Sequence, residues 1–123
     1  MFADPQTVTL DAPTGAKNLV KINQDGYSSE YLLKEATGEF RLKIRNSVNG
    51  TKREGTITTE RHNVELTWKV YPTTSYPSGI IRKAYIVVEN EVGDDPVLVN
   101  DLAESLIAWT SEANIVKLLA FES

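Results

Sequence analysis

Cationic and apolar side chains alternate in the middle of the chain. Between residues 40 and 45 the cations are Arg41, Lys43 and Arg45, and the residues between them are apolar. Because successive side chains of a strand point to opposite faces, the three cations would line one surface. Residues 61–71 repeat the alternation with these polar residues: Arg61, Asn63, Glu65, Thr67 and Lys69. Cations neutralise phosphates, and Asn and Thr can read base edges, so this face suits single-stranded or hairpin RNA.

Residues 80–90 form a further β-rich segment that would add Lys83 and Tyr85 to this surface. An aromatic ring beside cations can stack on an unpaired base. Both faces of the segment are mostly apolar, so the sequence does not determine which face is buried. The competing interpretation of the whole surface is a solvated outer face whose charges provide solubility, and the residues alone leave the two interpretations close.

The charge of the chain is unevenly distributed. The formal net charge is −4, yet residues 41–83 carry nine basic and three acidic side chains. Residues 1–40 and 84–123 are both acidic. A basic block inside an acidic chain indicates an anionic partner, whereas a mixed surface whose charges cancel in space is the alternative.

Catalytic chemistry has little support in the sequence. The absence of cysteine excludes disulfides, thiolate nucleophiles and cysteine-ligated metals. His62 is the single histidine, and a lone histidine in a strand is more often structural or solvated, because acid–base catalysis needs a placed partner. Neither a glycine-rich phosphate-binding loop nor a glycosidase-type carboxylate pair is present. We therefore expect no enzymatic activity.

Four carboxylates gather before the first expected helix, at Glu89, Glu91, Asp94 and Asp95. They suit the preference of helix N-termini for negative charge, and no cofactor is required. Ca²⁺ takes several oxygen ligands, so a Ca²⁺ site at a subunit contact is the alternative for this cluster. The chain also lacks the apolar run of about 20 residues that a membrane helix needs, and no secretory signal is visible. We expect a cytosolic protein, or part of a particle assembled in the cytosol, with no membrane partner.

The elements that must position these residues begin with strands. Residues 1–24 contain two short β runs around a Pro/Gly turn, which indicates an N-terminal β-hairpin. Residues 29–91 predict an antiparallel sheet of about five strands. A loop rich in turn formers, residues 72–79, precedes the last strand.

The last thirty residues change to a helical period. Asp95 can cap a helix that starts at Pro96, and Ser111 can cap a second, so residues 95–121 hold two helices. Strands followed by two helices predict a single α+β domain, residues 1–123. The first helix has an apolar stripe of Leu98, Leu102, Leu106 and Trp109. An apolar helix pair at the end of a small domain indicates packing in a dimer.

This order of elements resembles the coat proteins of single-stranded RNA bacteriophages of the levivirus type. The sequence is particularly similar to the coat protein of a Caulobacter-infecting RNA phage. The resemblance covers nearly the whole chain and is carried by four stretches, which are KINQDGY at 21–27, ERHNVE at 60–65, AY at 84–85 and VGD at 92–94.

The resemblance implies a structural protein of the virion that assembles in the bacterial host cytoplasm. Members of this family form intertwined homodimers whose strands join into one continuous sheet, with the helices of each chain packed across the partner. The dimers build a T=3 icosahedral capsid. Its inner sheet face contacts genomic single-stranded RNA, and in relatives an operator hairpin binds there and represses replicase translation. The loop at 72–79 corresponds to the loop that gathers around the symmetry axes.

The resemblance also implies which residues bind RNA. Tyr85 matches the position of a stacking aromatic, whereas Glu65 departs from the pattern because its charge repels phosphate. The alternative function is a dimeric RNA-binding translational regulator that assembles no shell. The RNA-binding role is carried over to Arg41, Lys43, Arg45, Arg61, Asn63, Thr67, Lys69, Lys83 and Tyr85.

Overall fold

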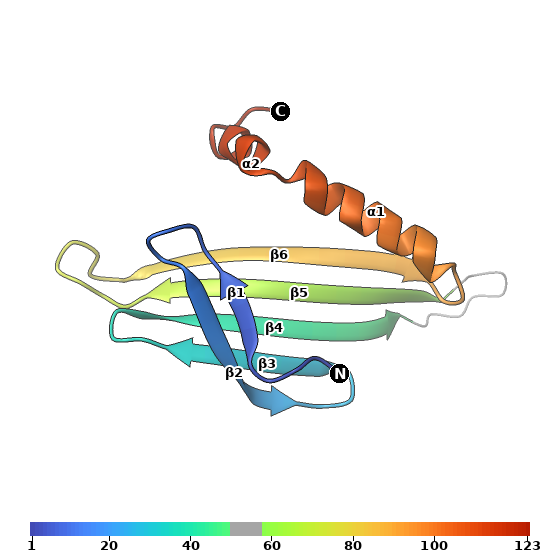
Figure 1. Cartoon of the computed structure of the whole chain (residues 1–123), viewed down its shortest axis with the longest axis horizontal. Coiled ribbons are helices and arrows are strands. Elements are labelled where there is room, and N and C mark those ends of the chain that lie inside the picture. The colour runs from blue at the N-terminus through green and yellow to red at the C-terminus, as the bar shows by residue number, and fades with distance from the viewer. Residues whose placement is uncertain (50–57) are drawn as a thin grey trace.

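A computed structural model describes residues 1–49 and 58–123 and has one antiparallel sheet followed by two helices (Figure 1). The six strands lie in sequence order across the sheet. This confirms the predicted α+β class, with the hairpin strands and the sheet strands joined in one sheet. The elements are β1 (Gln6–Thr9), β2 (Ala16–Gln24), β3 (Ser28–Lys34), β4 (Gly38–Asn49), β5 (Thr59–Val70), β6 (Ile80–Glu91), α1 (Pro96–Trp109) and α2 (Glu112–Leu119).

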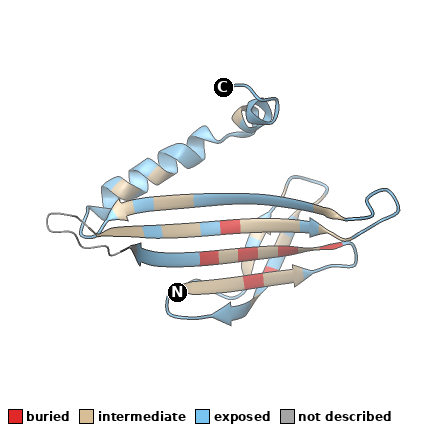
Figure 2. Ribbon diagram, turned by 180° about the vertical axis from the view of Figure 1, so that it is seen from behind, coloured by how far each residue is buried: buried red, intermediate tan, exposed pale blue. Residues whose placement is uncertain are grey.

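The sheet curls at its N-terminal end, so that the β1–β2 hairpin crosses over the strands that follow it (Figure 1). The buried core lies between this hairpin and the middle of the sheet. Figure 2 shows more buried positions on β4 than on any other strand. Phe40 stacks on Trp68 with their ring centroids 5.1 Å apart, and Val8 and Leu10 pack against the core from the hairpin side. The buried hydrophobic residues are Leu19, Tyr31, Phe40, Leu42 and Ile44.

The register of β4, β5 and β6 determines which residues share a face. Arg41 pairs with Thr67, which pairs in turn with Lys83. Because directly paired residues point to the same side of a sheet, the odd-numbered residues of these three strands share one face. We call this side the basic face. The even-numbered residues, Phe40 and Trp68 among them, form the opposite side, which we call the apolar face.

Both helices begin at the predicted caps. The Asp95 carboxylate accepts a hydrogen bond from the Val97 amide at 2.9 Å, and the Ser111 hydroxyl accepts one from the Asn114 amide. Figure 1 shows α1 extending past the β6 edge of the sheet, and neither helix contains a buried residue. Leu102 of α1 is 72% exposed. Neither helix of the described ranges has the length and apolar character needed to cross a membrane.

The loop between β5 and β6 closes on a glycine. Gly79 has φ +72°, and a Cβ there would stand 2.5 Å from the Val70 carbonyl oxygen. Its amide donates a hydrogen bond to the Tyr76 carbonyl at 2.9 Å. Glycine populates positive φ without a steric penalty, so the loop depends on glycine at this position.

Candidate nucleic-acid interface

The register brings all nine predicted RNA-binding residues onto the basic face. In the strand register, Lys43 lies opposite Glu65, and Glu65 lies opposite Tyr85. The edge strand β6 therefore contributes Lys83 and Tyr85 to the same side as the cations of β4 and β5. The sequence had left the orientation of residues 80–90 open, and the register of β5 with β6 settles it.

Glu65 lies at the centre of this face and is 8% exposed. Its carboxylate oxygens lie 2.6 Å from Arg45 Nη2 and 3.0 Å from Lys83 Nζ. The hydrogen bond from Lys83 lowers the pKa of Glu65; burial opposes this, and the charges of Lys83, Arg45 and Lys43 support it. The carboxylate is thus ionised and compensated by two cations. It does not present the isolated negative charge that the sequence suggested.

Other carboxylates also pair with cations of the basic face. Arg41 forms an ion pair with Glu30 of β3, and Arg61 lies 3.5 Å from Glu89 of β6. Of the six predicted cations, Lys43 and Lys69 are the two without an ion-pair partner among residues 1–49 and 58–123. An ammonium without an ion-pair partner can contact a phosphate without first breaking such a pair, so these two lysines are the strongest candidates for phosphate contacts.

Tyr85 is the aromatic residue of this face and is 65% exposed. Tyr85 belongs to β6, which pairs with β5 along one edge. The other edge of β6 has no partner strand in the described sheet. The ring therefore stands in solvent on the same face as Lys83 and opposite Glu65 in the strand register, where a base could stack on it. Asn63 accepts a hydrogen bond from Arg45 Nη2 at 3.3 Å, so its amide is held beside Arg45.

The apolar face is only partly covered. On β5 and β6, Val64 and Ile86 are 40% and 45% exposed, and Arg82 lies over the Trp68 ring with its guanidinium carbon 4.6 Å from the ring centroid. Ile81 on the basic face is also exposed. In a single chain, neither face of β6 is buried.

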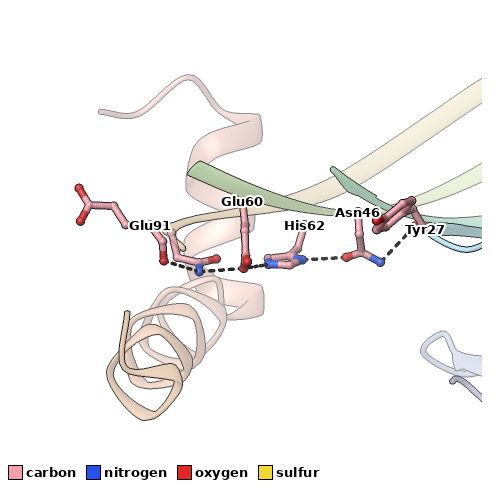
Figure 3. Close-up of polar contacts among 6 residues, drawn as sticks. Tyr27, Asn46, Glu60, His62 and Glu91 are labelled. Carbon is pink, nitrogen blue, oxygen red and sulfur yellow. Dashed lines mark hydrogen bonds and ion pairs between the residues drawn. The ribbon is translucent and has the colours of Figure 1, made fainter. Parts of the chain in front are cut away.

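His62 lies on the apolar face, away from the predicted RNA-binding residues, in a chain of polar contacts (Figure 3). Its Nδ1 is 2.7 Å from Asn46 Oδ1, and its Nε2 is 3.7 Å from the Glu60 carboxylate. The Asn46 amide donates to the Tyr27 carbonyl at 3.2 Å, and the Asn90 amide donates to Glu60 at 3.2 Å. These contacts connect the β2–β3 turn with β4, β5 and β6, which is the structural role expected for a lone histidine.

The carboxylates before α1 have separate partners. Glu89 pairs with Arg61, and Asp95 caps α1. The Asp94 carboxylate accepts a hydrogen bond from the Asp95 amide at 2.7 Å. In the part of the chain that the structure describes, no three His, Cys, Asp or Glu residues gather into a metal-binding group. A Ca²⁺ site shared between subunits stays a prediction.

The sequence did not predict which carboxylates pair with the cations of the basic face. Glu30 comes from β3, and its pairing with Arg41 depends on the register between β3 and β4. Glu89 was assigned to the helix N-terminus, although it pairs with Arg61 across β5 and β6. Alternation within one strand predicts the face of a residue but not its neighbours on other strands, so no signal in the sequence identified these pairs.

The sequence and the fold were each compared with known proteins. The model of a family described as "Phage phiCb5, coat protein" matches residues 3–91, which span the sheet from β1 to β6. No curated protein matches the chain significantly. The solved structure "Virus-like particle of bacteriophage AVE019" matches with a TM-score of 0.50 and 16% sequence identity, covering 89% of this chain and 86% of that chain. At this identity the likeness establishes a shared fold.

Proposed function

The chain belongs to the phage phiCb5 coat protein family, and from this premise we propose how it builds a particle and contacts RNA. Membership makes it a capsid protein of a bacteriophage virion, which is a structural and non-enzymatic role. The proposal is that two copies form an intertwined dimer and that dimers assemble into a T=3 icosahedral shell. The basic face of each dimer lines the interior and binds single-stranded genomic RNA.

Exposed apolar surface on the helices supports the dimer. Leu98, Leu102, Leu106 and Trp109 are each more than half exposed, and α1 extends past the β6 edge (Figure 1). Burying a leucine side chain contributes about 1.5–3 kcal/mol, so leaving this stripe in water is unfavourable. The partly exposed apolar face of a second copy provides apolar surface of the kind that would cover it.

The composition of the basic face is the observation that carries RNA binding. Lys43 and Lys69, which lack an ion-pair partner within the described ranges, provide charge for phosphates, and the exposed Tyr85 ring provides a stacking surface. Single-stranded loops are the form of RNA whose bases can be splayed onto such a surface. An operator hairpin that represses replicase translation would bind at the same place.

The T=3 shell rests on the likeness to levivirus-type coat proteins and on the β5–β6 loop. Figure 1 shows this loop projecting beyond the ends of the strands. A projecting loop can contact other dimers without disturbing the sheet. Altering residues 72–79 should therefore abolish particles while dimers persist, whereas a dimeric RNA-binding regulator that assembles no shell would lose neither binding nor dimerisation.

Expression of the chain alone in bacteria tests the proposal. We expect particles by electron microscopy and RNA that survives nuclease treatment inside them. Soluble monomers under conditions that preserve assembly contacts would contradict it. Imaging with and without EDTA tests the further proposal of Ca²⁺ at subunit contacts through the cluster of Glu89, Glu91, Asp94 and Asp95, because removal of a bridging ion should loosen the shell.

A further inference from the structure

The outer edge of β6 lacks a partner strand in the described sheet. β6 is twelve residues long, pairs with β5 on one side only and contains no proline. Long unprotected edges template pairing with another strand, and native proteins normally cover or interrupt them. The inference drawn from this edge rests on the proposed dimer and concerns the register in which two copies join.

Symmetry restricts how two β6 strands can pair. In a continuous antiparallel sheet with a two-fold axis perpendicular to it, both copies turn the same face to the same side. Directly opposed residues share a face, so odd-numbered residues oppose odd-numbered ones. Complete overlap, with Ile80 opposite Glu91, would pair residues of opposite faces and is excluded. One residue must therefore lie on the axis and oppose its own copy.

We propose that Ile86 lies on this axis. Lys83 then opposes the partner's Glu89, and Arg82 opposes the partner's Asn90. Around the axis, Ala84 opposes the partner's Val88, and Ile86 opposes itself on the apolar face. Opposite charges and apolar pairs directly across from each other stabilise antiparallel strands. Every pair occurs twice because of the symmetry, except the one on the axis.

Neighbouring registers match side chains less well. With Tyr85 on the axis, Lys83 would oppose the partner's Val87, and Glu89 would oppose the partner's Ile81. With Val87 on the axis, Lys83 would oppose the partner's Glu91, but Tyr85 would oppose the partner's Glu89 and Ala84 would oppose the partner's Asn90. The register with Ile86 on the axis has one such mismatch, Ile81 against the partner's Glu91, at the end of the overlap. Each alternative places a charged residue against an uncharged side chain two positions from the axis and loses the Lys83–Glu89 pairs.

The register with Ile86 on the axis would complete the basic face with residues of the second chain. Glu89 already pairs with Arg61, and Lys83 already pairs with Glu65. Contact between Glu89 and the partner's Lys83 would join these pairs into an ion-pair network that crosses the axis twice. The ion pairs near the axis would then connect the two chains. Lys43 and Lys69 lie farther from the axis and would remain available to bind RNA.

A cysteine scan tests the register, and the chain provides a cysteine-free background. Four single variants, Ala84→Cys, Tyr85→Cys, Ile86→Cys and Val87→Cys, are purified as particles, oxidised mildly and separated without reductant. Only the residue on the axis opposes its own copy at the Cα separation that a disulfide spans. We expect at least about ten-fold more crosslinked dimer for Ile86→Cys than for the other three, because each step away adds roughly 7 Å.

A double variant keeps the test decisive if Ile86→Cys does not fold. Tyr85 opposes the partner's Val87 in this register, so Tyr85→Cys/Val87→Cys should crosslink on the basic face although neither single variant does. Maximal crosslinking at Tyr85→Cys or Val87→Cys alone would overturn the register while leaving the coat function intact. Particles without any crosslink would show that β6 edges do not meet. Failure of the unmodified chain to form dimers or particles would instead overturn the proposed function.

Discussion

Glu65 and Lys83 form an ion pair on the basic face, with the carboxylate Oε1 3.0 Å from the lysine Nζ. The other carboxylate oxygen contacts Arg45 at 2.6 Å. Glu65 thereby compensates two cations of this face, whereas Lys43 and Lys69 have no ion-pair partner among residues 1–49 and 58–123. The division leads to different expectations for individual variants.

Glu65→Gln should lower the melting temperature at neutral pH by a few degrees, corresponding to about 1 kcal/mol, because a charge-assisted contact is lost. The folded-state pKa of Glu65 lies below its ordinary value of 4.5. The ionised carboxylate therefore stabilises the fold fully above pH 4.5, and this contribution is lost as the pH falls through the folded-state pKa. The difference in melting temperature should shrink as the pH is lowered further below 4.5.

Glu104→Gln is the matched control for this measurement, since Glu104 is an exposed residue of α1 without a recorded ion pair in the described ranges. Its melting temperature should follow the wild type at every pH. A Glu65→Gln deficit of the same size at low and neutral pH would contradict the role assigned to the ionised carboxylate.

Lys43→Ala and Lys69→Ala should weaken binding of single-stranded RNA and reduce the slope of log K against log salt by about 0.7 each. Arg45→Ala should change the slope less, because Glu65 already compensates its charge. Arg82→Ala is the control, since Arg82 belongs to β6 but lies on the apolar face over Trp68. An unchanged slope in both lysine variants would remove them from the interface.

Tyr85→Ala should lose about 1–3 kcal/mol of RNA affinity if a base stacks on the ring. Tyr85→Phe retains the ring and should bind nearly as tightly as the wild type. Affinities from filter binding on a hairpin with unpaired loop bases make the comparison. Equal losses in the Ala and Phe variants would indicate that the hydroxyl, and not the ring, makes the contact.

Gly79→Ala should reduce particle yield while leaving dimers. The residue has φ +72°, and the added methyl group would meet the Val70 carbonyl oxygen, so the loop must change its path. Size-exclusion chromatography and electron microscopy distinguish dimers from shells. Gly26→Ala is the control, because a Cβ at Gly26 meets nothing within 4 Å. Normal particles from Gly79→Ala would show that assembly tolerates a changed loop.

Leu102→Glu should convert dimers into monomers, because a charge would enter the apolar stripe that the partner is proposed to cover. Leu102 is 72% exposed in one chain, so the substitution should scarcely disturb the fold of that chain. Light scattering measures the mass, and circular dichroism checks the fold. Glu104→Lys alters a charge two positions from both Leu102 and Leu106, where a helical residue does not face them, and this control should stay dimeric. Dimers that persist in Leu102→Glu would place the helices outside the interface.

Patterns within single segments were sufficient to predict most elements. The alternation around Arg41 and Lys43 predicted the strand and its cationic side, and both helix caps were identified from Asp95 and Ser111. The nine residues proposed for RNA contact also share a face as expected. Residue type and local period are enough for these features because they depend on backbone geometry over a few residues.

The sequence by itself therefore determined the kinds of element, their order and the cationic side of β4 and β5. Only the tertiary structure decided that β6 turns Lys83 and Tyr85 to that side, and that Glu65, Glu30 and Glu89 neutralise particular cations. Pairing register brings together residues far apart in the chain, and local patterns contain no information about it.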